Sequence, residues 1–346
     1  MKVKINKIAS STKNIRLPHI VEISRKIEAR EDNLVVVKAL GENPRYGDIE
    51  LVSGRMSKII EGDMIAGVLG ERKAQKGFYG KVPSRIKAGD ILNILSLGGV
   101  IGKAVSAHPE LGNPISVEVI GMPLVFTAFD ERIGKPANIN EHAIQPRKTL
   151  EHSVPLILFS ASCMDAGKTT AACELIKGLV SRGHKVAGVK LTGVSLMRDT
   201  LAMQDYGAIR TLDFNDAGMV STTSRPVNNL AKGILHELNK DDIDCIVMEL
   251  GDGILGEYGV QSVLTDKGIT RFAKAHIVCA NDPVAAWGAK QLFEQFGLSI
   301  TSICGRVTDT KIGIEFIEKK LKIPAGNMLM SPQKVVNLVE KKVFGK

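Results

Sequence analysis

The segment from residue 162 to residue 170 combines a lysine, several hydroxyl groups and a glycine in an order suited to binding phosphate. It follows an apolar run and precedes an amphipathic stretch. The phosphate-binding pattern G-x-x-x-x-G-K-[ST] is matched except at its first position, where serine replaces glycine. In that pattern, successive backbone N–H groups and the helix dipole hold the phosphates. We therefore expect a phosphorylated ligand to bind at Ser162, Cys163, Met164, Asp165, Ala166, Gly167, Lys168, Thr169 and Thr170.

The side chains of this segment have different expected roles. Gly167 lets the backbone approach the ligand, and Lys168 places a positive charge on the outer phosphates. The Thr169 hydroxyl is a suitable ligand for Mg²⁺. Ser162 restricts the backbone where glycine is usual, which leaves the path of the loop open. The alternative interpretation is a Gly-Lys-Thr tripeptide that merely opens an ordinary helix.

An acidic strand end supports the phosphate-binding interpretation. The apolar run that ends at Glu249 is followed by Leu250-Gly251-Asp252-Gly253. A carboxylate at the tip of a strand beside the loop is where such enzymes hold Mg²⁺ or its water. Thr169 and Glu249 are therefore the expected metal ligands. The alternative is a glycine-rich turn with incidental acidic residues.

Lysine at the end of a second strand completes the expected catalytic group. Ligands gather at the carboxyl ends of parallel strands, so Lys190 should face the same crevice. We expect Lys168, Lys190 and Glu249 to be the catalytic residues. The polar residues that follow Lys190 in the sequence could equally well belong to solvated turns. The candidates for substrate contact among them are Thr192, Arg198, Asp199, Asp213, Asp216 and Asp252.

These residues must be positioned by a parallel sheet, because apolar runs alternate with helical patterns after residue 150. We expect residues 151–346 to form a P-loop NTPase-like α/β domain with a mostly parallel sheet. Gly183 is the expected stop of the helix that begins at Lys168. The expected strands are 154–160, 185–189, 243–250, 275–280 and 300–303, and the expected helices are 168–182, 283–296, 310–321 and 332–343.

Residues 1–130 have a different character and are expected to form a smaller β-rich domain, either a barrel or a sandwich. Their short apolar runs alternate with glycine-containing and charged turns. Ile59-x-x-Gly62-Asp63-Met64-Ile65 recurs 27 positions later as Ile86-x-x-Gly89-Asp90-Ile91-Leu92. This repeat indicates either a pseudo-repeat or coincidental turn chemistry. Residues 131–150 are polar, contain two prolines, and are expected to be a linker.

The loop, the strand lysine and the acidic strand end together resemble the dethiobiotin-synthetase-like branch of P-loop proteins. The closest resemblance is to a poorly characterised family that shares its P-loop domain with D-glutamate N-acetyltransferase. The resemblance covers roughly residues 152–325 and includes Asp213-Phe214 and 251–259. It implies a small-molecule substrate and a homo-oligomer with its site near a subunit interface. Ser162 departs from the family pattern, and the first 150 residues do not match its Rossmann-type domain.

Composition limits where the protein acts. Hydrophobic residues make up 44% of the chain, enough for buried cores, but no apolar run reaches membrane-spanning length. The first residues lack the apolar segment of a signal peptide. The five cysteines contain no Cys-x-x-Cys pair, which is typical of a reduced protein. We therefore expect a cytoplasmic protein with no membrane partner.

The leading hypothesis is an ATP- and Mg²⁺-dependent enzyme, ligase- or kinase-like, that activates a small carboxylate or carbamate. Lys168 and the loop amides would hold the β- and γ-phosphates, and Lys190 would neutralise charge on the substrate. Two alternatives stay open: an acetyl-CoA-dependent N-acyltransferase that uses the same loop, and a non-enzymatic nucleotide-binding switch. A metallochaperone-like switch would need a metal-ligand cluster, and Cys163 has no His or Cys partner at ligand spacing.

The net charge of +9 raises the question of nucleic acid. One stretch of the N-terminal region has the composition of a basic hairpin that could stack on bases. A solvated basic loop is the commoner explanation, so nucleic acid is not the expected partner. The residues concerned are Arg72, Lys73, Lys76, Phe78, Tyr79, Lys81, Arg85 and Lys87.

Overall fold

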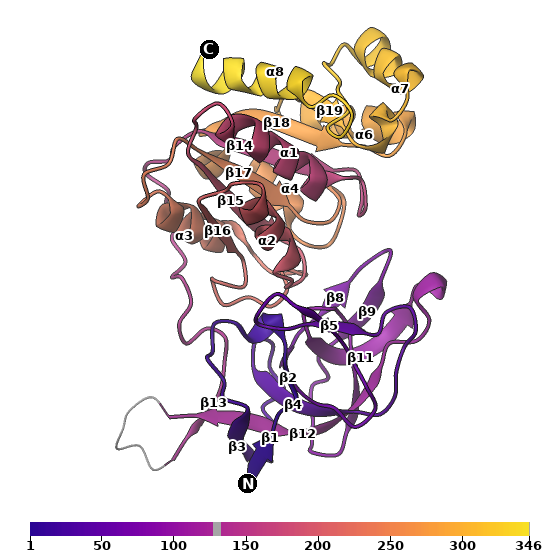
Figure 1. The fold of residues 1–346 in the computed structure, drawn as a ribbon, viewed down its shortest axis with the longest axis vertical. Coiled ribbons are helices and arrows are strands. Elements are labelled where there is room, and N and C mark those ends of the chain that lie inside the picture. Colours follow the sequence, from indigo (N-terminus) through magenta and orange to yellow (C-terminus); the bar gives the residue numbers. More distant parts are fainter. Residues whose placement is uncertain (127–132, 346) are drawn as a thin grey trace. The chain divides into compact units, whose positions relative to one another are not determined.

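A computed structural model describes residues 1–126 and 133–345 as two compact units (Figure 1). The first unit contains Met1–Ile144 together with Val194–Arg198 and Phe214–Thr223. The second contains Gln145–Gly193, Asp199–Asp213 and Ser224–Lys346. Residues 131 and 132 of the expected linker lie outside the described residues. After entering the second unit, the chain passes back into the first unit at residues 194–198 and again at residues 214–223, and each time it returns to the second unit.

The first unit is built from short strands with two turns of 3₁₀ helix. The turns are η1 (Ser10–Thr12) and η2 (Pro109–Leu111). The strands are β1 (Lys2–Lys4), β2 (Lys7–Ile8), β3 (Ile20–Ser24), β4 (Leu34–Ala39), β5 (Asp48–Glu50), β6 (Met56–Lys58), β7 (Met64–Leu69), β8 (Arg72–Lys73), β9 (Phe78–Lys81), β10 (Ile91–Ile94), β11 (Val100–Ala107), β12 (Ser116–Val125) and β13 (Lys135–Pro136).

Strand pairing closes this unit into a barrel. Strands β12, β4, β7, β11 and β10 each pair with the next, and β10 pairs back to β12. Closure leaves no unpaired edge within the ring. Side chains alternate along each strand, so Val35, Val37 and Ala39 of β4 all enter the same buried cluster. The sequence alternatives of barrel and sandwich are thus resolved as a barrel.

The repeated Gly-Asp segment is a structural repeat. Gly62 and Gly89 both have left-handed backbones, with φ of 90° and 94°. The Asp63 carboxylate accepts the Ile60 N–H at 2.8 Å, and the Asp90 carboxylate accepts the Lys87 N–H at 2.7 Å. The two turns pair in the same way with β4 and β12, which are neighbours in the barrel.

The apolar positions of the two copies also match. Ile59 and Ile65 of the first copy lie in the barrel interior, as do Ile86 and Leu92 of the second. Each turn therefore delivers one apolar side chain before it and one after it to the same core. The repeat is a pseudo-symmetric pair of turn-and-strand units.

Residues 133–139 belong to the barrel unit although the sequence assigned them to the linker. Strand β13 pairs with β12, and Ala137 and Ile139 are fully buried. The Leu34 N–H donates to the Ala137 carbonyl at 2.9 Å. Alternation of Ala137 and Ile139 with polar neighbours is a strand-like signal, which the prolines and charges around it obscured.

Each of the two returning segments is anchored within the first unit by buried polar contacts. The Met197 N–H donates to the Glu50 carboxylate at 2.6 Å, and the Val220 N–H donates to Asp32 at 2.9 Å. Val194 and Ser221 form an isolated antiparallel bridge that joins the two segments to each other. Their hydrogen bonds explain why residues 194–198 and 214–223 belong to the barrel unit.

The basic segment that was weighed as a nucleic-acid-binding hairpin is partly buried. Arg72 is 7% exposed, and its guanidinium donates to the Tyr46 hydroxyl at 2.9 Å and to the Leu95 carbonyl. Phe78 is fully buried and packs edge-to-face on Tyr46. These two side chains belong to the core of the barrel unit and are not available to stack on a base.

The second unit alternates strands with helices. Its strands are β14 (Leu156–Ala161), β15 (Val186–Thr192), β16 (Arg210–Asp213), β17 (Cys245–Leu250), β18 (Ala273–Cys279) and β19 (Ser302–Cys304). Its helices are α1 (Lys168–Val180), α2 (Arg198–Asp205), α3 (Asn228–Leu238), α4 (Val260–Thr265), α5 (Lys267–Thr270), α6 (Pro283–Gln295), α7 (Lys311–Phe316) and α8 (Gln333–Phe344). A 3₁₀ turn, η3 (Arg306–Thr308), precedes α7, and a π-helical segment, η4 (Ile317–Leu321), continues it.

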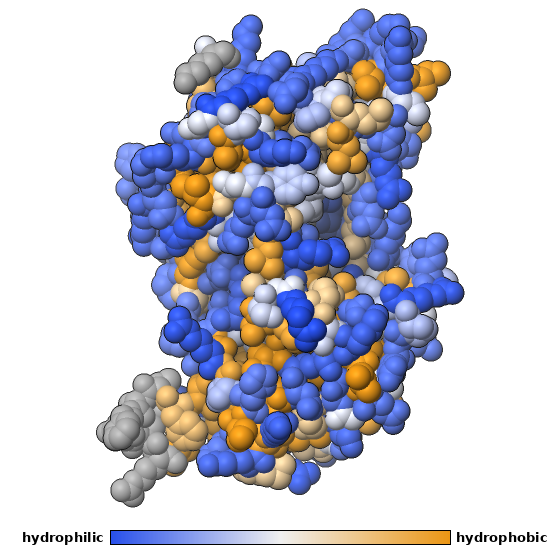
Figure 2. All heavy atoms as spheres, in the orientation of Figure 1, coloured by the Kyte–Doolittle hydropathy of each residue, from blue (hydrophilic) through white to orange (hydrophobic). Residues whose placement is uncertain are grey.

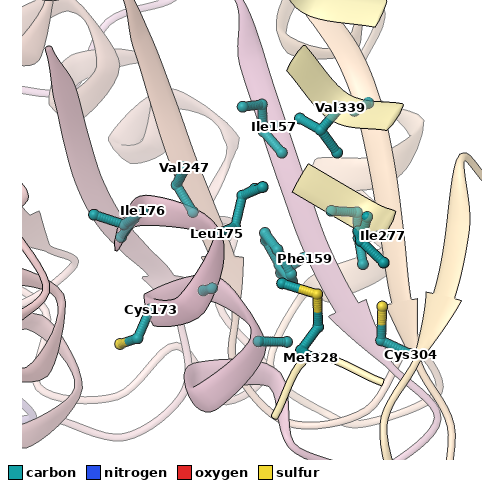
Figure 3. Close-up of a cluster of buried hydrophobic side chains, with 14 of the residues drawn as sticks. Ile157, Phe159, Cys173, Leu175, Ile176, Val247, Ile277, Cys304, Met328 and Val339 are labelled. Atoms are coloured by element: carbon teal, nitrogen blue, oxygen red, sulfur yellow. The ribbon is translucent and has the colours of Figure 1, made fainter. Parts of the chain in front are cut away.

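All the strands of this sheet are parallel, in the order β16-β15-β17-β14-β18-β19. This is the expected P-loop α/β fold, with the loop strand β14 in the interior of the sheet. Figure 3 shows Phe159 and Ile277 of the sheet facing Leu175 of α1 and Val339 of α8. These helices therefore cover one face of the sheet over a single apolar core.

Helix α1 confirms the predicted start residue and the predicted stop signal. It starts at Lys168, and Gly183 lies beyond its end with φ of 89°. The Gly183 N–H donates to Val180 and the His184 N–H donates to Leu179, which is the paired bonding of a glycine-terminated helix. The predicted helix extended two residues too far.

Strand β16 and helices α2, α3, α4 and α5 were not among the expected elements. Strand β16 is only four residues long and mostly half-buried, so its pattern is weak. Helix α3 does carry a signal: Leu230, Ile234 and Leu238 recur at helical spacing and are buried. The helix was not predicted because Asn228 and Asn229 at its start continue a polar region of the sequence.

Polar residues cover most of the face seen in Figure 2, with apolar side chains in small groups. Within the described part of the chain, no helix has both the length and the apolarity needed to cross a bilayer.

The two Gly-Asp turns predict a matched pair of stability losses. Gly62→Ala and Gly89→Ala should each lower the free energy of unfolding by about 1–2 kcal/mol, because L-residues are strained at positive φ. An added Cβ meets nothing within 4 Å at either glycine, so no clash contributes. Denaturant titration of the purified chain measures this.

Gly41→Ala is the control, since Gly41 is in the same unit, has no left-handed φ and has open space around its Cβ position. It should change stability by less than about 0.5 kcal/mol. Equal losses at all three glycines would contradict the explanation.

Candidate functional site

The loop between β14 and α1 has the path that phosphate binding requires. Its left-handed residues are Asp165, with φ of 56°, and Gly167, with φ of 90°. Ser162 is not left-handed, so serine fits where the sequence pattern has glycine. The Ser162 N–H donates to Cys279 of β18 at 3.0 Å, which fixes the start of the loop. Asp165 is a strained non-glycine residue of the kind that clusters at functional sites.

The loop offers a series of backbone donors. Among the described residues, no acceptor pairs with the backbone N–H groups of residues 163–170. The first hydrogen bond of helix α1 runs from the Ala171 N–H to the Gly167 carbonyl at 3.0 Å. A run of unpaired N–H groups at the start of a 13-residue helix is a ready site for an anion.

Lys168 is held beside these donors. Its side chain is 7% exposed, and its Nζ donates to the Cys163 carbonyl at 3.2 Å. The ammonium therefore lies across the mouth of the loop. An anion bound by the loop amides would contact a positive charge that is already in place.

Thr169 and Glu249 join the loop to the next strand. The Thr169 hydroxyl donates to Glu249 Oε1 at 3.0 Å, while Glu249 Oε2 is buried and has no hydrogen-bond partner in the described structure. Burial, followed by the Asp199 charge, raises the pKa of Glu249 to about 7. Burial of a carboxylate costs free energy when one of its oxygens has no hydrogen-bond partner, unless a cation or a hydrogen-bond donor binds that oxygen.

Strand register explains why Glu249 meets the loop. Cys245 and Val247 of β17 enter the core beneath α1, and alternation places Glu249 on the same face. Register pairs Lys190 of β15 with Glu249 on one side and with Asp213 of β16 on the other. The three side chains form a charged row near the carboxyl ends of adjacent strands.

Lys190 is a buried cation among carboxylates. Its Nζ forms an ion pair with Asp199 of α2. Burial alone would lower the pKa of Lys190, but Asp199 and the two carboxylates of its row outweigh burial and raise the pKa. Lys190 is therefore fully charged in the folded protein.

Acidic groups outnumber basic groups at this edge. Lys168 and Lys190 face the carboxylates of Asp199, Asp213 and Glu249. No cluster of three or more His, Cys, Asp or Glu side chains within the described residues could enclose a metal ion by itself. Mg²⁺ commonly takes one or two protein ligands and completes its shell with phosphates and water. Thr169 and Glu249 fit that role.

The other predicted substrate residues divide into two groups. Asp252 has a left-handed φ of 70° in the turn after β17. Thr192 is fully buried and its hydroxyl donates to the Gly251 carbonyl at 3.0 Å, which makes it a structural link between two strand ends. Arg198 and Asp216 belong to the first unit, where Asp216 pairs with Lys13. They are not among the residues that the second unit brings together.

Sequence reasoning missed Gly253 as a site residue. A Cβ at Gly253 would lie 2.6 Å from the Ser162 carbonyl oxygen, closer than a real Cβ is found. Only glycine lets the turn after β17 pack directly on the start of the phosphate loop. The glycine-rich segment 251–253 was recognised as a turn, but nothing in the sequence indicated which loop it contacts.

Asn281 lies between β18 and α6, next to the residue that caps the helix. The structure shows Asp282 as the cap of α6, since its carboxylate accepts the Ala285 N–H at 2.8 Å. Asn281 instead donates its side-chain amide to the Cys163 sulfur at 3.0 Å. Asn281 thus contacts the phosphate loop directly.

No protein-family model matches this chain, and no curated protein sequence matches it. Some solved structures are similar at low identity. The signal recognition particle receptor FtsY from Elizabethkingia anophelis in complex with GDP is 14% identical, with a TM-score of 0.36 over 60% of this chain and 68% of its own.

Two further solved structures are similar at the same level. A duf1611 family protein from Anabaena variabilis is 12% identical, with a TM-score of 0.38 over 56% of this chain and 63% of its own. A nucleotide-binding protein from Archaeoglobus fulgidus in complex with ADP is 12% identical, with a TM-score of 0.35 over 54% and 85%. Values this low assign no family, and they give no support to a dethiobiotin-synthetase-like membership.

The close approach at Gly253 predicts a binding defect. If the loop binds a phosphorylated ligand, Gly253→Ala should weaken that binding by roughly 10- to 100-fold, because the added methyl displaces the start of the loop, and ATP serves as the probe. Gly41→Ala is the control, since a Cβ there meets nothing within 4 Å and the residue belongs to the first unit. Calorimetric titration of ATP compares them. Unchanged affinity in a folded Gly253→Ala protein would contradict the role assigned to this contact.

Proposed function

We propose that the second unit binds ATP with Mg²⁺ and transfers the γ-phosphoryl group to a small carboxylate or carbamate. The reaction is ligase- or kinase-like. The observation that carries this proposal is the Thr169–Glu249 contact. It places a hydroxyl and a carboxylate with one vacant oxygen directly beside a loop of unpaired N–H groups.

The chain's own residues supply binding and charge compensation. The N–H groups of residues 163–170 hold the β- and γ-phosphates, and Lys168 carries its charge to the outer phosphates. The Mg²⁺ that Thr169 and Glu249 would hold neutralises phosphate charge. These groups are preorganised by the sheet and by α1, which is how such sites stabilise a transition state.

The transferred group needs an acceptor oxygen in line with the bond that breaks. A carboxylate oxygen attacks the γ-phosphorus, the bond to the bridging oxygen breaks, and ADP leaves with the electron pair. The products are an acyl phosphate and ADP, and no redox partner is required. A nucleophile that then attacks the acyl carbon would make the reaction a ligation.

Lys190 suits the acceptor side of the reaction. It is buried, charged and already oriented by Asp199. A carboxylate acceptor that replaces Asp199 as its partner would lie in the charged row with Glu249. Lys190 would then lower the repulsion between two anions as they approach.

Removal of the loop lysine is the most direct test. Lys168→Ala should weaken ATP binding by about 10- to 100-fold, because a charge-assisted contact is worth about 1.5–3 kcal/mol. Lys177→Ala, an exposed position on the same helix, is the control. Unchanged ATP affinity in Lys168→Ala would refute the proposal, as would tight binding of acetyl-CoA with no binding of ATP.

A substitution at Glu249 tests its proposed role as a metal ligand. Glu249→Gln keeps an acceptor for Thr169 but removes the negative charge, so Mg²⁺ affinity in the presence of ATP should fall by about 10- to 100-fold. Binding of ATP in the absence of divalent cations should not weaken. Titration of Mg²⁺ into the ATP-loaded protein measures this. Equal Mg²⁺ affinity in both proteins would remove Glu249 from the metal site.

A further inference from the structure

The second unit contains a cavity beside the phosphate loop. Its volume is about 290 Å³, near the lower limit for small-molecule sites, so it admits only a small ligand. It lies between the start of the loop, the segment after β17 and one side of helix α6. The lining includes Cys163, Ile254, Leu255, Ala289 and Leu292.

Most of the cavity is apolar, because helix α6 contributes small residues to it. Ala285, Gly288 and Ala289 line it at spacings that lie on one side of a helix. A Cβ added at Gly288 would meet nothing within 4 Å, so open space begins at the helix backbone. Ile254 and Leu255 add apolar surface from the segment after β17. A short hydrocarbon group would leave water on entering this space, which favours its binding.

The cavity adjoins the end of the loop that would receive the outer phosphates. Cys163 lines the cavity, and its carbonyl accepts a hydrogen bond from the Lys168 ammonium at 3.2 Å. A lysine at this position of a phosphate loop contacts the β- and γ-phosphates. The base of a nucleotide is attached at the opposite end of the phosphate chain. A nucleotide bound in this orientation therefore leaves the cavity open to a different ligand.

The polar end of the cavity offers hydrogen-bond acceptors. The Asn281 side chain donates to the Cys163 sulfur at 3.0 Å, and its Oδ1 is buried without a hydrogen-bond partner in the described structure. The Asp282 carboxylate is the second acceptor, and only its Oδ1 is engaged, by the Ala285 N–H at 2.8 Å. A buried polar oxygen without a partner costs free energy, which a ligand recovers if it brings a donor.

Charge at this end of the cavity favours a neutral ligand. An anion would face the Asn281 oxygen and the Asp282 carboxylate. A cation would lie near Lys168 and at the start of the 13-residue helix α6, where the helix dipole is positive. A primary carboxamide avoids both conflicts, because it is neutral and carries two N–H donors. Its carbonyl is also matched, since Ser162 lines the same end and supplies a hydroxyl donor.

We propose that this cavity binds a small primary carboxamide with an aliphatic body, as a second ligand beside the nucleotide. The amide N–H groups donate to Asn281 Oδ1 and to the Asp282 carboxylate, and the aliphatic body lies against Gly288, Ala289 and Leu292. This inference goes beyond the proposed function and does not compete with it, because the carboxylate acceptor keeps its place at the charged row. Binding of the amide requires no nucleotide.

Ligands that share one carbon skeleton test the head group on the full chain. Butanamide, butanoate, butylammonium and N,N-dimethylbutanamide are titrated separately, and protein NMR measures each affinity. Butanamide should bind at least about tenfold more tightly than the others, because it alone is neutral and brings donors to the unpaired oxygen. Equal or tighter binding of any of the other three would overturn the proposal.

The aliphatic body and the nucleotide are tested in the same way. From acetamide through propanamide to butanamide, affinity should rise about threefold to fourfold for each added methylene. A flat series would overturn the apolar part of the site. ADP with Mg²⁺ should leave the affinity for butanamide unchanged. Displacement of butanamide by ADP would assign the cavity to the nucleotide and would also overturn the proposal.

Two substitutions locate the binding. Asn281→Leu removes the acceptor, so butanamide should lose its advantage over N,N-dimethylbutanamide. The ratio of these two affinities reports the head group even if loss of the contact to Cys163 moves the loop. Gly288→Leu fills the open space and should weaken butanamide binding about tenfold or more. Gln295→Leu is the control, since it adds the same side chain at an exposed position of α6 that does not line the cavity, and it should change nothing.

The two proposals fail in different ways. Amide binding is measured without nucleotide, so a wild-type protein that does not bind ATP would lose the proposed function and keep the preference for butanamide. Circular dichroism identifies the variants that fold. A folded Gly288→Leu protein with wild-type affinity for butanamide would show that the amide binds elsewhere, and the cavity assignment would be wrong even when ATP binds.

Discussion

The hydrogen bond between Thr169 and Glu249 is the contact on which the whole site depends. It joins the first turn of α1 to the tip of β17, the strand beside the one that leads into the loop. Parallel pairing and alternation place these two residues together, since Glu249 continues the same-face series of Cys245 and Val247. Without that register, the loop donors and the carboxylate would not serve one ligand.

The local chemistry of this region could be predicted from sequence because each signal is short-range. A buried strand, a glycine-lysine-threonine turn and an amphipathic helix follow one another without interruption. The Gly-Asp repeat was also readable, although only the matching hydrogen bonds of Asp63 and Asp90 distinguish a true repeat from coincidence. Barrel closure could not be predicted, because it depends on which distant strands pair.

Contacts between segments that lie far apart in the chain could not be predicted from the sequence. Nothing in residues 194–198 and 214–223 indicates that they leave the second unit, since their partners Glu50 and Asp32 are far away in the chain. The same applies to Gly253, whose small size matters only because Ser162 lies against it. Arg198 and Asp216, which were predicted as substrate contacts, belong to the first unit, because proximity in sequence to Lys190 and Asp213 does not keep them in the same unit.

A crystal of the protein soaked with a non-hydrolysable ATP analogue and Mn²⁺ would test the central claim most directly. The account predicts an anomalous peak in contact with the Thr169 hydroxyl and Glu249, with the terminal phosphates against the N–H groups of residues 163–170. A metal peak elsewhere, or a phosphate chain bound away from this loop, would contradict it.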